Sequence, residues 1–307
     1  MRILVTGGAG FIGSHIVDRY VKAGHTVGIV DDFSTGKEEN LIDAAKSGRL
    51  TIFETDIRDA DEMARILERF RPEVVNHHAA TIDVTWCEAN QEEAFEINVD
   101  ATAALGILAK EADVRRFIFA SSAAVYGECD QPATEGQPPT PVGIYGASKL
   151  AAEIHLQSIA LESDSEMVAV ILRYSNVYGA RSECGVIPLF LDRWANGERP
   201  TIYGDGEQSR DFIHVADVAA ANLSVLSKPA FDEGYRTFNI STGQTINVNR
   251  LWVLLTTEAG EARPEEILQS CLDSTRARHE LGFEALIDVG QGLASLRLML
   301  AATGRRG

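Results

Sequence analysis

Short apolar runs alternate with amphipathic stretches through the first 174 residues, and this alternation constrains the fold more than any other feature. The runs have the length of strands and few polar residues at alternate positions, which is typical of strands buried on both faces in a parallel sheet. The pattern predicts an α/β fold with a doubly wound parallel sheet covered by helices. The expected strands are 3–6, 26–30, 50–53, 74–77, 116–121 and 168–174, and the expected helices are 11–23, 60–70, 92–112 and 145–163.

A glycine-rich turn, Gly7-Gly-Ala-Gly-Phe-Ile-Gly13, joins the first expected strand to the first helix. Glycines permit a tight turn and let the backbone approach a pyrophosphate, which then faces the positive end of the helix. Asp31 ends the second strand, where a carboxylate accepts hydrogen bonds from an adenosine ribose and repels a 2′-phosphate, so NAD is favoured over NADP. The expected cofactor contacts here are Gly7, Gly10, Phe11, Ile12, Gly13, Asp31 and Asp32.

Two further pairs of residues follow the third and fourth expected strands. Asp56 and Ile57 follow the third strand, where a carboxylate can meet the adenine amine. Ala79 and Ala80 follow the fourth, where small side chains leave room for the cofactor. Taken alone, an ordinary strand-end loop explains each pair equally well.

Beyond residue 174 the alternation loosens, and Gly, Pro and charged residues become frequent between 179 and 211. A helix at 215–226 and a strand at 237–240 are expected to return to the parallel sheet. We therefore expect a Rossmann-type NAD-binding domain of residues 1–174 with returning segments near 213–240. Residues 175–212 and 241–307 are expected to form a smaller C-terminal substrate domain.

Tyr145 and Lys149 stand four residues apart, on one face of an expected helix. A phenol is a poor base at neutral pH, but a nearby ammonium and a positive nicotinamide favour tyrosinate, which suits Tyr145 to acid–base work on a hydroxyl. Ser121 and Ser122 end the fifth strand, at the edge where open α/β sheets bind ligands. A surface pair at i,i+4 spacing is the alternative for Tyr145 and Lys149 taken alone, and an ordinary turn is the alternative for the two serines. Because both motifs follow the glycine turn in the expected order, a catalytic site is favoured.

The chain carries 28 basic and 45 acidic residues, a net charge of −17. Such a surface repels nucleic acid and anionic membranes, so neither is an expected partner, and an anionic substrate needs local arginines. No apolar run is long enough to span a membrane and no secretory signal is visible, so a cytoplasmic location is expected. The four cysteines lack metal-ligand spacing, so no metal is expected.

Together these motifs resemble the extended short-chain dehydrogenase/reductase family, and within it the NAD-dependent epimerases and dehydratases, most closely the UDP-glucose 4-epimerases. The resemblance covers nearly the whole chain. It is carried by the glycine turn, Asp31, Asp56-Ile57, Asn98-Val99, Ser121–Gly127, Tyr145–Lys149, Arg173–Gly179, Gly204–Gly206 and Arg210–Val215.

The resemblance implies NAD-dependent 4-epimerisation of a UDP-hexose, such as UDP-glucose or UDP-galactose. Ser122 would orient the sugar 4-hydroxyl, Tyr145 would remove its proton, and Lys149 would bind the nicotinamide ribose and tune Tyr145. The hydride would pass from C4 to NAD and return to the other face of a 4-keto sugar. The resemblance also assigns Asn98 and Tyr174 to the cofactor.

For the nucleotide sugar, the resemblance implies that Asn176 contacts the diphosphate and that Arg210 and Arg263 neutralise it, with a surface salt bridge as the alternative for each arginine. If the imperfect match around Arg263 is in register, Ser270 stands where a bulky residue excludes N-acetylated sugars. A small serine there predicts that the N-acetyl forms are also accepted.

Ala123 and Ala124 argue against related reactions, because the dehydratases and decarboxylases that the chain resembles place acidic residues there, and alanine transfers no proton. Two alternatives stay open: another epimerase or oxidoreductase acting on UDP-glucuronate or a dTDP-sugar, and a non-catalytic NAD-sensing protein. His77 is expected to pack in the interior, whereas His78 and the segment 81–90 receive no role. The apolar stripes of 92–112 and 145–163 match the helices that form a homodimer in the resembled family, so a homodimer is expected.

Overall fold

Seven parallel strands form the central sheet of the computed structural model, which describes residues 1–129, 131–202, 204–228, 231, 234–256 and 271–302. All six neighbouring pairs run parallel, in the order β3-β2-β1-β4-β5-β6-β9. The doubly wound sheet predicted from the apolar runs is thereby confirmed. The strands are β1 (Arg2–Thr6), β2 (Thr26–Asp31), β3 (Leu50–Glu54), β4 (Val74–His77), β5 (Arg116–Ser122), β6 (Val168–Tyr174) and β9 (Tyr235–Ile240).

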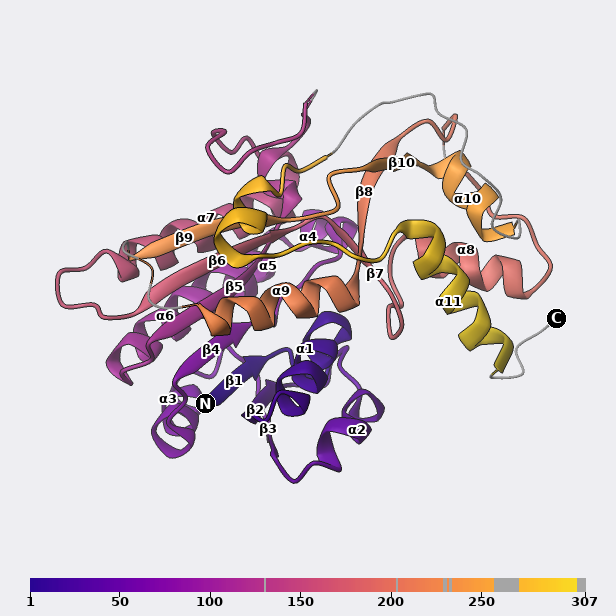
Figure 1. Cartoon of the computed structure of the whole chain (residues 1–307). Coiled ribbons are helices and arrows are strands. Elements are labelled where there is room, and N and C mark those ends of the chain that lie inside the picture. Colours follow the sequence, from indigo (N-terminus) through magenta and orange to yellow (C-terminus); the bar gives the residue numbers. More distant parts are fainter. Residues whose placement is uncertain (130, 203, 229–230, 232–233, 257–270, 303–307) are drawn as a thin grey trace.

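Helices cover both faces of this sheet (Figure 1). On one face lie α1 (Phe11–Lys22) and α9 (Val215–Ser227), with the short η1 (Glu38–Leu41) and α2 (Ile42–Ala45) beside α1. On the other face lie α3 (Ala60–Phe70), α6 (Ala101–Glu111) and α7 (Gly143–Ala160). Strand β9 and helix α9 return to the sheet as expected, because their apolar side chains complete its last edge and one of its faces.

The helix expected over 92–112 is present but contains one irregular turn. The chain runs without a break through α5 (Gln91–Phe95), a π turn η2 (Glu96–Asp100) and α6, and the separate helix α4 (Val84–Ala89) precedes it. Such wide turns are often found at functional sites. Here the turn directs the buried Asn98 amide toward the loop after β4, where it bonds both backbone groups of Thr81. The local hydrogen bonds of Asn98 thus override the helical period.

A smaller unit follows β6 along the chain and has its own apolar core. Its sheet has the order β10-β8-β7. The loosened stretch 179–211 contains a helix that the sequence pattern missed, because Pro188 and the flanking Gly185 mark a turn; proline is tolerated in a first helical turn. The elements are β7 (Asn176–Tyr178), α8 (Val186–Ala195), β8 (Ser209–His214), β10 (Thr245–Asn247), α10 (Val248–Thr256) and α11 (Val289–Ala302). Between α10 and α11 the chain returns to the large sheet, where the short π turn η4 (Ala277–Leu281) packs against α9 and β9. Among the described helices, none is both long and apolar enough to cross a membrane.

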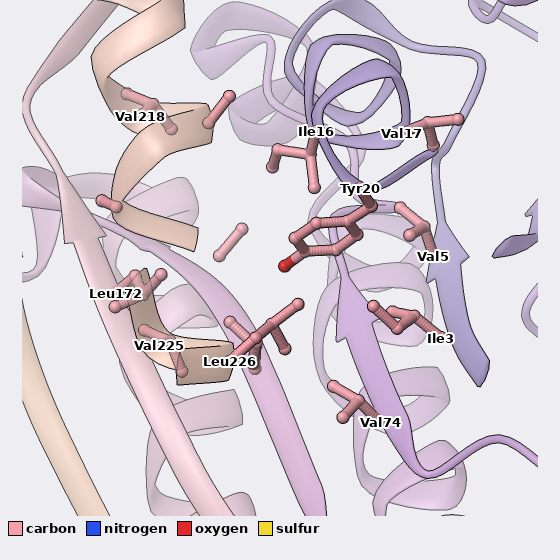
Figure 2. Packing of buried hydrophobic residues seen from close by; sticks show 14 of the residues in the cluster. Ile3, Val5, Ile16, Val17, Tyr20, Val74, Leu172, Val218, Val225 and Leu226 are labelled. Atoms are coloured by element: carbon pink, nitrogen blue, oxygen red, sulfur yellow. The ribbon is translucent and has the colours of Figure 1, made fainter. Parts of the chain in front are cut away.

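Tyr20 anchors the core between α1, α9 and the sheet. Figure 2 shows its ring among apolar side chains of both helices and its hydroxyl directed away from α1. That hydroxyl accepts a hydrogen bond from Asn76 Nδ2 (2.8 Å), and the same amide nitrogen donates to Asn222 Oδ1 (3.0 Å). Burial raises the pKa of Tyr20, so the phenol stays neutral. One polar chain therefore joins α1, β4 and α9.

Replacing Tyr20 by Phe removes this hydroxyl while keeping the ring. We expect the free energy of unfolding to fall by about 1–2 kcal/mol, because a buried amide hydrogen then loses one acceptor. Urea denaturation measures the change. The matched control is Tyr235→Phe, at the half-buried start of β9, with an expected change within about 0.5 kcal/mol. Equal stability of Tyr20→Phe and the wild type would contradict this role.

Candidate active site

The candidate site lies at the carboxyl ends of the central strands. The strand order reverses at β1, which has β2 on one side and β4 on the other. Open α/β sheets bind ligands at such a switch point, outside the carboxyl ends of the strands. The glycine turn follows β1 there, and Ser122 ends β5 two strands away.

The glycine turn is packed too closely for side chains. Gly7 has a positive φ of 65°, and a Cβ on it would lie 2.7 Å from the Ala79 nitrogen. A Cβ on Gly13 would lie 2.0 Å from the Gly7 carbonyl oxygen. Helix α1 begins after Gly10 with no side-chain cap and no acidic residue in its first turn. Its first N–H groups, in the turn that contains Phe11 and Ile12, therefore suit a pyrophosphate.

Asp31 lies directly against this turn. Its carboxylate accepts hydrogen bonds from the backbone nitrogens of Ala9 (2.8 Å) and Phe33 (3.0 Å), and burial raises its pKa. The expected ribose ligand thus also braces the turn, a second role that the sequence did not indicate. The neighbouring Asp32 is exposed and accepts from the Ser34 backbone nitrogen (3.0 Å). A cradle of N–H groups beside a carboxylate fits NAD.

Asp56 follows β3 as expected, but it is paired. Its Oδ2 lies 2.6 Å from Arg58 Nη2, and hydrogen bonding to Arg58 lowers its pKa. Ile57 is buried in the core on the α3 side. The adenine contact expected of Asp56 stays a prediction, since one carboxylate oxygen can accept more than one hydrogen bond.

Hydrogen bonds with Thr6 and Asn98 hold the loop after β4 in place. Ala79 and Ala80 are half-buried, and the Ala79 nitrogen lies 3.3 Å from Thr6 Oγ1. Asn98, which the resemblance assigned to the cofactor, donates from Nδ2 to the Thr81 carbonyl (3.0 Å) and to Ser148 Oγ (3.1 Å). Its polar atoms therefore fix the loop that lines the expected cofactor site, and a direct contact stays a prediction.

The two neighbouring histidines differ in environment. His77 is 1% exposed and lies between Thr6 Oγ1 (2.6 Å) and Thr102 Oγ1 (2.9 Å), so the expected interior packing is confirmed. His78 stacks on Tyr174 and shares a hydrogen bond with its hydroxyl (3.1 Å). That hydroxyl also accepts from Asn222 Nδ2 (2.9 Å), so Tyr174 contacts protein groups, and its expected cofactor contact stays a prediction.

Ser122, Tyr145 and Lys149 are brought together where β5 meets α7. Burial raises the pKa of Tyr145 and the nearby Ser122 side chain lowers it by less, so that it lies at about 12. Lys149 Nζ donates to the Ala120 carbonyl (3.1 Å) and lies 5.0 Å from the centre of the Phe119 ring. Burial lowers the pKa of Lys149 to about 8. Neighbouring titratable groups with perturbed pKa values are typical of a catalytic site.

The residues expected to bind the nucleotide sugar lie on the smaller sheet. Asn176 on β7 is exposed and donates to the Asp211 carbonyl (3.2 Å). Arg210 on β8 is exposed and donates to the Ser209 carbonyl (2.7 Å), which leaves its other guanidinium nitrogens open to a phosphate. Arg263 and Ser270 lie outside the described residues.

Sequence reasoning missed two acidic residues near the site. Glu88 on α4 accepts from the Ile144 backbone nitrogen (2.7 Å) and caps α7 one residue before Tyr145, which gives the unassigned segment 81–90 a structural role. Asp211 on β8 is 1% exposed and accepts from the backbone nitrogens of Thr242 (3.1 Å) and Gly243 (2.9 Å). Glu88 stands in no recognisable motif, whereas Asp211 lies within the motif Arg210–Val215 but was given no role. Within the described ranges, no cluster of His, Cys, Asp and Glu could hold a metal ion.

A glycine turn at the switch point of a parallel sheet, with a Ser–Tyr–Lys group at the next strand ends, defines a dinucleotide-dependent enzyme of the Rossmann type. The chain belongs to the NAD dependent epimerase/dehydratase family, whose model matches residues 3–241. NAD is therefore its cofactor.

Three members of that family are similar to this chain over nearly its whole length. The chain is 38% identical over 306 residues to a putative UDP-glucose 4-epimerase of Methanocaldococcus jannaschii, covering 95% of each chain. It is similar to a UDP-glucose 4-epimerase structure of Thermotoga maritima with UDP-glucose, with a TM-score of 0.88, 36% identity and 99% coverage of each chain. It is also similar to a UDP-glucuronic acid 4-epimerase of Bacillus cereus in complex with UDP-glucuronic acid and NAD, with a TM-score of 0.88, 25% identity, and coverage of 99% of this chain and 100% of that one.

Replacing Gly13 by Ala places a methyl group against the Gly7 carbonyl and forces the turn apart. We expect NAD affinity to fall at least about tenfold, equivalent to about 1.4 kcal/mol. Calorimetric titration with NAD, or the NAD content of the purified protein, measures the change. Gly136→Ala is the control, because a Cβ there meets nothing within 4 Å. Unchanged affinity in Gly13→Ala would show that the turn does not carry the cofactor.

Proposed function

We propose that this protein catalyses the NAD-dependent 4-epimerisation of a UDP-hexose, with UDP-glucose and UDP-galactose as its substrates. The placement of Ser122 at the end of β5 near Tyr145, with Lys149 on the same face of α7 and the glycine turn two strands away, is the observation that carries the proposal. The named activities of the Methanocaldococcus and Thermotoga relatives support the substrate class.

The residues that suit NAD lie in the first half of the chain. The turn from Gly7 to Gly13 and the start of α1 hold the pyrophosphate, and Asp31 accepts from the adenosine ribose. When bound, NAD supplies an acceptor for the C4 hydride and returns it to the opposite face of the sugar. Residues 1–174, with β9 and α9, are thus assigned to the cofactor, and residues 175–212 and 241–307 to the nucleotide sugar.

Tyr145 is the group that moves the proton. Ser122 donates to or accepts from the sugar 4-hydroxyl and keeps it within reach of Tyr145, whose pKa is itself lowered by the Ser122 side chain. A phenol with a pKa of about 12 is almost fully protonated at neutral pH, so its ionisation depends on positive charge nearby. With a pKa of about 8, Lys149 is largely protonated at neutral pH and supplies that charge. Tyr145 then takes the proton and later returns it.

The neighbouring residues restrict the chemistry to epimerisation. Ala123 and Ala124 follow Ser122 directly in the 3₁₀ turn η3 (Ala123–Tyr126), and neither carries a group that can transfer a proton. A 4-keto sugar held there meets no acid from this turn that promotes elimination. The intermediate therefore takes the hydride back. The retained Tyr145 and Lys149 also argue against a non-catalytic NAD sensor.

UDP-glucuronate is the second candidate substrate. The similarity to the Bacillus epimerase extends over the whole chain with a TM-score of 0.88. The sugar 4-hydroxyl is common to both substrates, so the Ser–Tyr–Lys group serves either one. UDP-glucuronate differs from UDP-glucose at C6, and the N-acetyl forms differ from it at C2. The protein must therefore discriminate between these sugars by contacts at those two positions.

We expect Tyr145→Phe to lower turnover by about 10²–10⁴-fold, because the phenyl ring fills the same space without accepting a proton. The measurement is product formation from a panel of UDP-glucose, UDP-N-acetylglucosamine, UDP-glucuronate, dTDP- and GDP-sugars, without added NAD, resolved by chromatography. Tyr235→Phe controls for the loss of a phenol elsewhere.

Epimer formation from one UDP-hexose without net NADH supports the proposal. Stoichiometric NADH would favour the oxidoreductase alternative. Turnover of none of the sugars by the wild-type protein would contradict the enzymatic proposal.

We further propose a cytoplasmic homodimer. Ile107 on α6 is 49% exposed, and Ile154 and Leu161, on α7 and at its end, are 57% and 61% exposed. Apolar side chains at this exposure on two adjacent helices suit a helix-to-helix contact with a second copy. The four cysteines are free, as is usual for cytoplasmic proteins.

The double variant Ile107→Glu/Ile154→Glu should be monomeric, because four carboxylates would then be buried in each symmetric contact. Size-exclusion chromatography with light scattering gives the mass. Ile52→Glu is the control, since Ile52 is 46% exposed on the edge strand β3, away from α6 and α7. A dimeric double variant would place the interface elsewhere.

A further inference from the structure

Glu153 is a fully buried acidic residue on the catalytic helix, at 0% exposure. It follows Tyr145 and Lys149 at intervals of four, so the three side chains share one face of α7. Its carboxylate accepts a hydrogen bond from Ser121 Oγ and another from Arg173 Nε (2.9 Å), and it forms an ion pair with the Arg173 guanidinium. No step proposed above uses this residue.

The partners of Glu153 stand at strand ends that carry the site. Ser121 and Arg173 are register partners on β5 and β6, one residue before Ser122 and Tyr174. Arg173 also donates from Nη1 to the Tyr126 hydroxyl (2.7 Å), which donates to Asn239 Oδ1 (2.8 Å) on β9. The carboxylate therefore joins α7 to the ends of three neighbouring strands.

This contact sets the axial position of α7. Tyr145 meets Ser122, Lys149 meets the Ala120 carbonyl and Phe119 ring, and Glu153 meets Ser121. Four consecutive residues of β5 thus bind three consecutive turns of one helix face. A shift of α7 along its axis would break the Glu153 contact and the Lys149 bond to the Ala120 carbonyl, and would move Tyr145 away from Ser122.

Glu153 also acts on the charge of Lys149. The titratable groups that act on Lys149, or on which it acts, are Cys87 from α4, His77 from β4, His78 from the loop after it, and Glu153 from α7 itself. Burial lowers the pKa of both histidines and raises that of the Cys87 thiol, so all three are neutral at neutral pH. Burial lowers the pKa of Lys149, and Cys87 and then Glu153 raise it. Because burial keeps the Cys87 thiol neutral at neutral pH, Glu153 is the charged group of these four that acts on Lys149.

We propose that Glu153 is a positioning residue for the catalytic pair: it seats α7 against the end of β5 and keeps the Lys149 side chain in its ammonium form. The catalytic consequence rests on the proposed function, whereas the effect on Lys149 does not. Stability alone does not explain the residue, because a buried ion pair can often be replaced by apolar side chains without loss of stability.

Two single variants break the ion pair between Glu153 and Arg173: one removes the negative charge and the other removes the positive charge. Glu153→Gln removes the negative charge and leaves Arg173, so the titration midpoint of Lys149 should move to lower pH by about one pH unit. Arg173→Met leaves the carboxylate beside Lys149, so the midpoint should stay or move to higher pH. A purely structural role predicts the same behaviour in both.

Nuclear magnetic resonance of protein labelled at lysine Cε reads this midpoint without any activity. The chain has six lysines, and Lys149→Met assigns the signal. Thermal melting of each variant reports the structural loss. If Glu153→Gln leaves the Lys149 midpoint in place, or if both variants move it equally, the proposal is overturned.

The effect of Glu153 on catalysis is measured as kcat/KM against pH, with the UDP-sugar that the wild-type protein epimerises as the substrate. Glu153→Gln should lower kcat by about 10–100-fold and move the alkaline loss of activity to lower pH, while Arg173→Met keeps that limb in place. Inactivity of the wild-type protein on every sugar would refute the proposed function but leave the Lys149 titration decisive. A shifted titration with an unshifted activity limb would refute the catalytic part of the proposal.

Discussion

The site depends on how closely the end of β1 can approach the end of β4. A Cβ on Gly7 would lie 2.7 Å from the Ala79 backbone, and one on Gly13 would lie 2.0 Å from the Gly7 carbonyl. The absence of side chains lets α1 begin directly over the switch point, with its first N–H groups uncapped. Everything that holds the cofactor follows from this spacing, because the helix dipole acts only within about one turn of its end.

Buried polar groups around the site position one another more than they stabilise the fold. Asn98, Glu88 and Asp211 each bind backbone groups of a loop or helix end, and Glu153 binds two strand ends. A net gain of about 1 kcal/mol for a hydrogen bond is small beside the cost of leaving a buried group unpaired. Such groups therefore penalise alternative loop positions more than they favour the fold as a whole, which suits a site that must hold two ligands in register.

The sequence predicted those features that follow from local pattern. Continuous apolar runs give parallel strands, and the glycine turn, strand-end serines and Tyr–Lys spacing lie at the site in the expected order. It did not predict the π turn at Asn98, the cap of α7 by Glu88 or the ion pair between Glu153 and Arg173. Each of these joins residues that are distant in sequence, so no local period marks it. Helix α8 was missed because Gly185 and Pro188 are equally compatible with a turn and with a helix start.

Electrostatics explain how an acidic chain can bind two anionic ligands. Near the cofactor site, Arg58 is paired with Asp56 and Arg181 with Asp18, at 2.6 and 2.8 Å, and Lys37 forms an ion pair with Glu183. These cations are already compensated, so the cofactor phosphates must be met chiefly by backbone N–H groups and the α1 dipole. Those partners carry no counterion of their own and are not lost by protonation. The exposed guanidinium of Arg210 remains on the smaller sheet, where the second diphosphate is expected. Backbone groups are therefore expected to bind the cofactor pyrophosphate, and a side-chain cation the diphosphate of the substrate.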